Sequence, residues 1–135
     1  MNSLTDNDEL AKYLFKEKEM RADGRPRPNT LKPKTGQMLS MSEVTQLEHI
    51  KICKHGHQYV DNASIGRVHI GYVKFYHESL INLQLQTIYD NVKPLHVSVG
   101  FPDDDEKRRE LAKALADEAI IIDEKSDKKY FADCR

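Results

Sequence analysis

The chain has 135 residues, 39% of them hydrophobic and 32% charged, and its charges nearly cancel to a formal net charge of −1 at pH 7. This length and hydrophobic fraction suit one domain with one core. The balanced charge lacks the strongly basic or acidic character that would indicate DNA, an anionic membrane or an acidic substrate as the partner.

The first predicted element is an N-terminal helix. Thr5 and Asp8 have the spacing of a capping box, which is typical of a helix start. A narrow apolar stripe follows at helical spacing, formed by Leu10, Tyr13 and Leu14. The helix is predicted to end near Met20, because a glycine and two prolines follow closely.

Residues 21–38, called the basic loop below, contain three prolines and five basic residues against one acidic residue. Proline fixes φ and removes a donor, so an extended loop around the core is expected. Two interpretations stay open: a solvated loop, or a cationic arm that binds phosphate or an acidic partner. In the second interpretation the binding residues are Arg21, Arg25, Arg27, Lys32 and Lys34.

A second capping box predicts a second helix. Ser40 and Glu43 have the required spacing, and the helix is expected over about 41–54. Val44 and Leu47 would then face the core, together with Ile50.

The hydrophobic period changes to two after Gly66. This alternation predicts two strands of a β-hairpin, over 68–77 and 80–90, with a turn at 77–79. A third strand is predicted over 95–101, where apolar and polar residues alternate again.

A C-terminal helix is predicted over about 103–119, with Asp103 as its N-cap. Residues 120–122 either extend it or form a short edge strand, and residues 123–135 are predicted to be a loose charged tail. The predicted fold is therefore one α+β domain over residues 1–122. It contains two N-terminal helices, a three-stranded mainly antiparallel sheet and a C-terminal helix packed on the sheet.

The third predicted strand carries the most specific chemical pattern. His96 and Ser98 lie on one face of it, about 7 Å apart. Such a pair suits phosphate, with the imidazole as acid or base and the hydroxyl as a donor. The pattern is similar to half of the active site of the two-histidine phosphoesterases. His69 is the other strand histidine in a comparable setting, but it lacks the neighbouring hydroxyl.

Cys53, His55 and His57 alternate at the end of the second predicted helix. Structural zinc usually takes four ligands in two spaced pairs, and no second pair is present. A polar loop beside a buried cysteine is therefore the preferred interpretation, and no metal or cofactor is predicted. His49, one helical turn before Cys53, keeps the metal alternative open.

The location predicted from the sequence is the cytoplasm. No apolar run approaches the eighteen or so residues of a membrane span, and the N-terminus lacks the features of a signal peptide. With only Cys53 and Cys134, two free thiols in a reducing compartment are expected, and no membrane partner is predicted.

Several short motifs are similar to those of a small group of uncharacterised bacterial proteins. The matching residues are Arg21, Asp23, Gly24, Arg27, Pro28, Leu31, Pro33, Leu39, Ser40, His96, Val97, Val99, Pro102, Leu111 and Ala112. The family pattern has Phe where this chain has Leu31, and Ala where it has Val97. The resemblance covers most of the chain and implies no particular activity. It implies that the basic loop and His96 belong to one unit.

Two hypotheses about function follow. The leading hypothesis is a non-enzymatic binding or accessory module whose basic loop engages a protein or a phosphate-bearing ligand. The alternative is an enzyme acting on a phosphate-containing small molecule or RNA end. It would use His96 as acid or base, Ser98 as phosphate donor, and Arg25 or Arg27 as clamp, with His69 in the same pocket. Binding of nucleic acid by the loop and nearby aromatic residues is not favoured, and the sequence predicts no oligomeric state.

Overall fold

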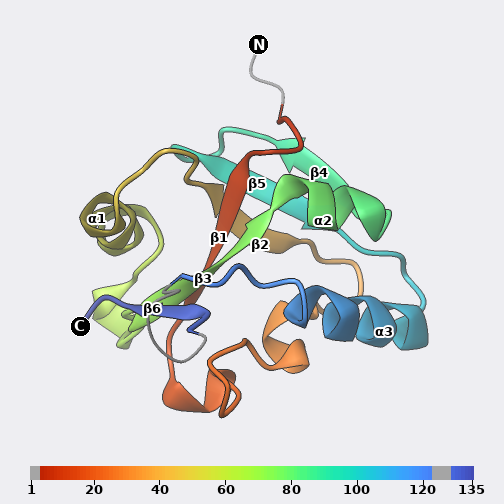
Figure 1. Ribbon diagram of the computed structural model, residues 1–135, viewed down its shortest axis with the longest axis horizontal. Coiled ribbons are helices and arrows are strands. Elements are labelled where there is room, and N and C mark those ends of the chain that lie inside the picture. Colours follow the sequence, from red (N-terminus) through yellow and green to blue (C-terminus); the bar gives the residue numbers. More distant parts are fainter. Residues whose placement is uncertain (1–3, 123–128) are drawn as a thin grey trace.

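The computed structural model describes residues 4–122 and 129–135 and contains one six-stranded sheet (Figure 1). The strand order is β4-β5-β2-β1-β3-β6, and all neighbours pair in antiparallel fashion. The strands are β1 (Glu9–Leu14), β2 (Leu39–Glu43), β3 (Gly71–Tyr76), β4 (Gln86–Tyr89), β5 (His96–Gly100) and β6 (Phe131–Asp133). The α-helices are α1 (His49–Tyr59), α2 (His77–Asn82) and α3 (Asp105–Ala116). The predicted three-stranded sheet after two N-terminal helices is therefore wrong.

Strand β1 replaces the first predicted helix. Leu10 and Leu14 pack into the core on one face of the sheet, and Ala11 and Tyr13 pack into the core on the other face. A central strand that is buried on both faces loses the apolar–polar alternation of a half-exposed strand. Its apolar residues then also fit helical spacing, which explains the error.

Strand β2 replaces the first half of the second predicted helix, over 41–54. Leu39 and Met41 are buried while Ser40 between them is exposed, which is the period of a strand. Helix α1 begins only at His49. The capping-box spacing of Ser40 was therefore misleading, because that residue lies on a strand face and not at a helix end.

The predicted hairpin between residues 68–77 and 80–90 is not formed. Helix α2 occupies the predicted turn at 77–79, and the second strand shortens to β4. Strand β3 pairs with β1 and β6, whereas β4 pairs with β5. Leu80 is fully buried and Ile81 is 45% exposed, so the alternation assumed for this segment does not hold.

Strand β5 and helix α3 lie where a third strand and a C-terminal helix were expected. The N-cap is Asp104 and not Asp103, since the Asp104 carboxylate accepts the backbone N–H of Lys107 at 3.1 Å. Among the described residues, no helix is long and apolar enough to span a membrane.

The C-terminal segment is tied to the body of the protein. Strand β6 pairs with β3, and Cys134 forms a disulfide with Cys53 of α1, where free thiols were expected. The tail predicted over 123–135 therefore ends in a strand of the sheet. Its residues 123–128 lie outside the described part of the chain.

The two faces of the sheet are covered unequally. Helix α3 packs on one face, where Leu115 joins the core around Leu10 and Phe75. Helix α1 packs on the opposite face, where Ile52 contacts the cluster around Tyr13 (Figure 1). The buried residues of this second cluster come from β1, β3, β6 and α1 and from Val44 directly after β2, and none comes from β4 or β5. On that side β5 presents His96 and Ser98, which lie beside Ser40 of β2, and these residues belong to the candidate site.

Candidate functional site

Asp90, His96 and Ser40 form a chain of hydrogen bonds on the face of the sheet opposite α3. Asp90 Oδ1 lies 2.6 Å from His96 Nδ1, and His96 Nε2 lies 3.2 Å from Ser40 Oγ. A carboxylate only accepts hydrogen bonds, so the network assigns the imidazole proton to Nδ1. Nε2 is then free to accept the hydroxyl proton of Ser40.

The strand register produces this arrangement. In the β2–β5 pair, Ser40 lies opposite Ser98 and Ser42 lies opposite His96. Ser40 and His96 are therefore diagonal neighbours on one face, within reach of each other's side chains. Asp90 directly follows β4 and extends the β4–β5 pairing to the level of His96.

The connection between β4 and β5 is conformationally unusual on both sides of the site. Asn91 follows Asp90 with φ of 54°, and Leu95 precedes His96 with φ of 63°. Residues other than glycine seldom adopt this left-handed region, and a bulky leucine does so at a cost in free energy. The Leu95 carbonyl accepts the Glu43 N–H at 2.8 Å, which anchors the connection to β2. Such strain concentrates at functional sites.

Asp90 is held in its ionised form. Burial disfavours the charge, but hydrogen bonds from Ser98, His96 and the backbone N–H of Val92 outweigh burial and lower the pKa of Asp90 to about 2. The Ser98 hydroxyl donates to Asp90 Oδ2 at 2.5 Å. Ser98 therefore fixes the carboxylate that orients His96.

A cavity of about 340 Å³ opens beside Ser40 and His96. Lys12 of β1, Arg67 after the 3-10 turn that precedes β3, and Lys93 of the β4–β5 connection line it. Within residues 4–122 and 129–135, none of these three cations forms an ion pair. The cavity therefore combines a serine–histidine–carboxylate chain with three cations that form no ion pair with a described residue.

Lys12 is the most buried of the three cations. Its ammonium group lies 3.5 Å from the Ser40 carbonyl oxygen, where β1 and β2 stop pairing. Burial and the positive charge of Arg67 lower the pKa of Lys12 to about 8, against an opposing effect of Glu19. Lys93 acts in the same direction as Arg67.

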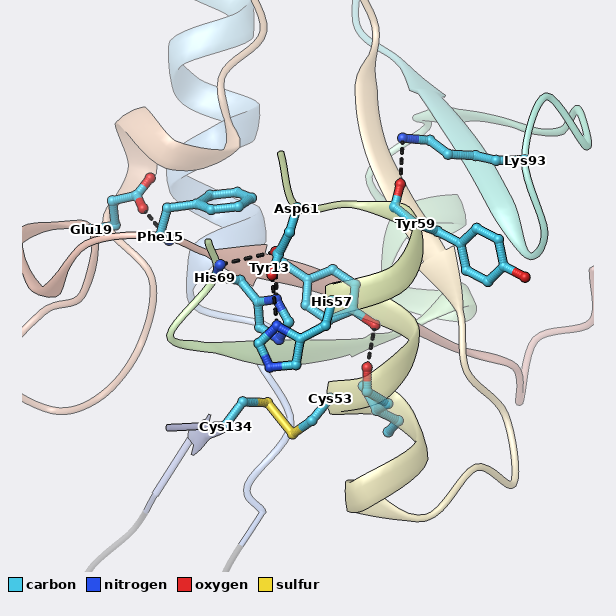
Figure 2. A network of polar contacts seen from close by, with 11 residues as sticks. Tyr13, Phe15, Glu19, Cys53, His57, Tyr59, Asp61, His69, Lys93 and Cys134 are labelled. Atoms are coloured by element: carbon cyan, nitrogen blue, oxygen red, sulfur yellow. Dashed lines mark hydrogen bonds and ion pairs between the residues drawn. A yellow bond between two sulfur atoms is a disulfide. The ribbon is translucent and has the colours of Figure 1, made fainter. Parts of the chain in front are cut away.

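The other two cations are held at the rim. The Arg67 guanidinium lies 4.2 Å from the ring centroid of Phe15. Lys93 Nζ donates to the Tyr59 carbonyl oxygen at 3.3 Å, a contact that joins the β4–β5 connection to the end of α1 (Figure 2). Both side chains are exposed enough to reach a ligand in the cavity.

His69, the expected second histidine of a phosphoesterase site, does not line this cavity. Its Nδ1 lies 2.7 Å from Asp61, whose other carboxylate oxygen lies 2.6 Å from His57 Nδ1 (Figure 2). The His69 ring packs edge-on against Tyr13, and Gly56 leaves room for both rings. His69 thus fixes the loop after α1 to the sheet, and the structure does not bring it together with His96.

The basic loop also lies apart from His96. None of its residues lines the cavity beside His96. Arg27 and Lys34 are exposed and form no ion pair with any described residue. The other three basic side chains form ion pairs: Arg21 with Asp23 and Asp117, Arg25 with Asp23, and Lys32 with Asp105. The clamp expected from Arg25 or Arg27 is therefore not assembled around His96.

In the part of the chain that the structure describes, two clusters have donor sets that a metal ion could use. One is His57, Asp61 and His69, and the other is His49, Cys53 and Cys134. In each, the ligand atoms lie within 4.8 Å of one another. The first set already forms the hydrogen bonds described above, and the second contains the disulfide. His55, which lies on α1 with His49 and Cys53, is buried, and burial lowers the pKa of its imidazole.

The sequence pattern draws attention to His96 and Ser98 but not to Asp90, the three cavity cations or Ser40 as a site residue. Ser40 has the spacing of a helix cap, and Asp90 is the last residue of the strand predicted over 80–90. The antiparallel register of β2 with β5 is the signal that unites these residues. That register is not visible in any local pattern, because 56 residues separate Ser40 from His96.

Comparisons of the chain with protein-family models, with curated proteins and with solved structures found no match. The similarity of its short motifs to a bacterial family stays a prediction. The proposals below rest on the geometry of the site.

Proposed function

We propose that the chain binds a small phosphate-bearing ligand in the cavity beside Ser40 and His96. The convergence of Lys12, Arg67 and Lys93 without an ion-pair partner among the described residues carries this proposal. Three neighbouring cations repel one another in the free protein, and a bound anion removes that cost.

The arrangement suits phosphate better than a single carboxylate. A phosphate dianion has two negative charges and several acceptor oxygens, which match a lysine point charge and a guanidinium fork. The hydroxyl of Ser40 supplies a further polar contact at the cavity wall. A carboxylate would neutralise fewer of the three charges.

The cations that would bind phosphate are those of the cavity and not those of the basic loop. Three of the five loop cations are already paired within the protein, and an exposed ion pair adds little as a binding surface. The hypothesis of a phosphate site around His96 is thus kept, but its cations are Lys12, Arg67 and Lys93 and not Arg25 or Arg27.

Titration with inorganic phosphate by calorimetry tests the proposal, with acetate as the carboxylate probe. Lys12→Met keeps the length of the side chain and removes its charge, and we expect at least about a tenfold loss of phosphate affinity. Lys113→Ala, an exposed position on α3, is the matched control and should leave the affinity unchanged. Equal phosphate affinity of the wild-type protein and Lys12→Met would contradict the proposal.

A further inference from the structure

We propose that Ser40 is a nucleophile that attacks the phosphorus of a phosphate ester in the cavity, with His96 as its general base. This inference rests on the phosphate binding proposed above and adds catalysis to it. Asp90 acts through His96, and Ser98 acts through Asp90, so both are positioning residues.

The distances are those of an activated serine. A nucleophile and its base need to lie within hydrogen-bond reach, about 2.6–3.2 Å, with the base oriented by a third group. Ser40 Oγ and His96 Nε2 are 3.2 Å apart, and Asp90 is 2.6 Å from the other ring nitrogen. The roles define such a triad, and the order in the chain does not matter.

Solvent exposure also distinguishes Ser40, the nucleophile, from His96, the base. Ser40 and His96 both line the cavity, but Ser40 is exposed whereas His96 is only 8% exposed. Ser98 donates to Asp90 and so is not directed at the ring, and Ser42, which lies opposite His96 in the strand pairing, is buried. Ser40 is therefore the hydroxyl that can meet a ligand while keeping its contact with the base.

Lys12 places a positive charge beside Ser40. Its ammonium group lies next to the Ser40 backbone, so a phosphoryl group at Ser40 Oγ would lie within the field of the Lys12, Arg67 and Lys93 cations. Positive groups positioned where charge develops are a large contribution to phosphoryl transfer. They also reduce the repulsion between a dianionic ester and an incoming oxygen.

The reaction balances without a further reagent except water. Ser40 Oγ bonds to phosphorus as the ester P–O bond breaks, and the serine proton passes to His96 Nε2. His96 then donates this proton to the leaving alkoxide, which departs as an alcohol. Water, deprotonated by His96, attacks the phosphoserine, and the His96 proton returns to Ser40. The overall change is phosphate ester plus water to alcohol plus inorganic phosphate.

The experiment uses the full chain with p-nitrophenyl phosphate. We expect release of p-nitrophenol and, after an acid quench, a peptide containing Ser40 that is heavier by one phosphoryl group in mass spectrometry. Ser40→Ala and His96→Asn should each reduce the release rate at least about a hundredfold. Ser64→Ala is the control, because Ser64 is exposed and bonds to the side chain of Asn62, not to a histidine.

The same variants separate the two proposals. Inorganic phosphate affinity should fall by less than about tenfold in Ser40→Ala, because one polar contact is lost while the three cations remain. Phosphate binding without ester hydrolysis or phosphoserine would overturn the nucleophile and leave the binding proposal intact. Absence of both would overturn both proposals. Release by Ser40→Ala at the wild-type rate would also overturn the role of Ser40.

Asp90→Asn tests the positioning role. Asparagine can present an amide N–H to His96 Nδ1 and so favour the tautomer that carries its proton on Nε2, which cannot accept the hydroxyl proton of Ser40. We expect kcat for p-nitrophenyl phosphate to fall at least about a hundredfold while KM stays within about threefold. A comparable loss of inorganic phosphate affinity would assign Asp90 to folding alone. Circular dichroism of the same sample shows whether the fold is retained.

Discussion

Single side chains decide the chemistry at the residue scale, and Lys12 is the clearest case. Its side chain reaches from β1 to the Ser40 carbonyl oxygen of β2 and lines the same cavity as Arg67 and Lys93. The low pKa of this lysine, about 8, expresses the cost of burying a cation near others. A ligand that carries negative charge would reverse that cost.

Anion binding should therefore depend on pH through Lys12. Sulfate is the suitable probe, because its charge is constant over the neutral and alkaline range. Lys12 is protonated below a pKa of about 8, so sulfate affinity should be highest there and should fall as the pH rises through that value. Calorimetric titrations from pH 6.5 to about pH 9.5 measure this. Lys12→Arg, which stays charged, should abolish the dependence, and an unchanged pH dependence in this variant would contradict the assignment.

A second residue-scale prediction concerns the support of the loop after α1. A Cβ on Gly56 would lie 2.5 Å from ring atoms of both Tyr13 and His69. Tyr13 is fixed by its bond to the Ile52 carbonyl at 2.7 Å, and His69 is fixed by Asp61, so neither ring can easily move. Gly56→Ala should lower the free energy of unfolding by about 1–3 kcal/mol, although alanine favours helix.

Urea denaturation measures this change, and Lys51→Ala on the exposed side of α1 is the control. Stability of Gly56→Ala at or above that of the wild-type protein would show that the two rings can rearrange.

Two elements that were predicted near their observed positions, β5 and α3, each have one polar face. Strand β5 alternates cleanly, and α3 has acidic residues at its start and a narrow apolar stripe. Strand β1 is buried on both faces, so its apolar residues fit a helix equally well. The spacing of Ser40 and Glu43 in β2 imitates a helix cap, although no helix follows directly. Sequence periodicity describes one element, whereas burial on a second face depends on its neighbours.

The disulfide should stabilise the attachment of α1 to the sheet. It links Cys53 on α1 with Cys134 beside β6, across a separation of 81 residues. Closing a long loop restricts the unfolded chain, and removing such a bond typically costs about 2–5 kcal/mol. Urea denaturation with and without dithiothreitol should show a loss in this range. The double variant Cys53→Ser/Cys134→Ser should be insensitive to the reductant, and equal stability of the wild-type protein in both conditions would contradict the prediction.

The whole molecule places its site where helix coverage of the sheet ends. Helix α1 covers the β1 and β3 side of one face, and the cavity lies beside it, lined by residues of β1 and β2 and by His96 of β5. Ser40, Asp90 and His96 meet there through strand pairing, and the cations arrive from three further segments. The sequence could indicate His96 together with Ser98, because alternation along one strand is a local pattern. The partners of His96 follow from topology, and the topology was predicted wrongly.

Two cationic surfaces therefore exist on one nearly neutral molecule, and they can be separated by charge removal. The double variant Arg67→Ala/Lys93→Ala removes the rim of the cavity, and Arg27→Ala/Lys34→Ala removes the two exposed cations of the basic loop. Both change the net charge by −2, so long-range effects on anions are matched. Inorganic phosphate affinity should fall at least about tenfold in the first variant and stay within about twofold of wild type in the second. The opposite order would assign phosphate binding to the basic loop, and an equal loss in both would show that net charge, and not the cavity, attracts the anion.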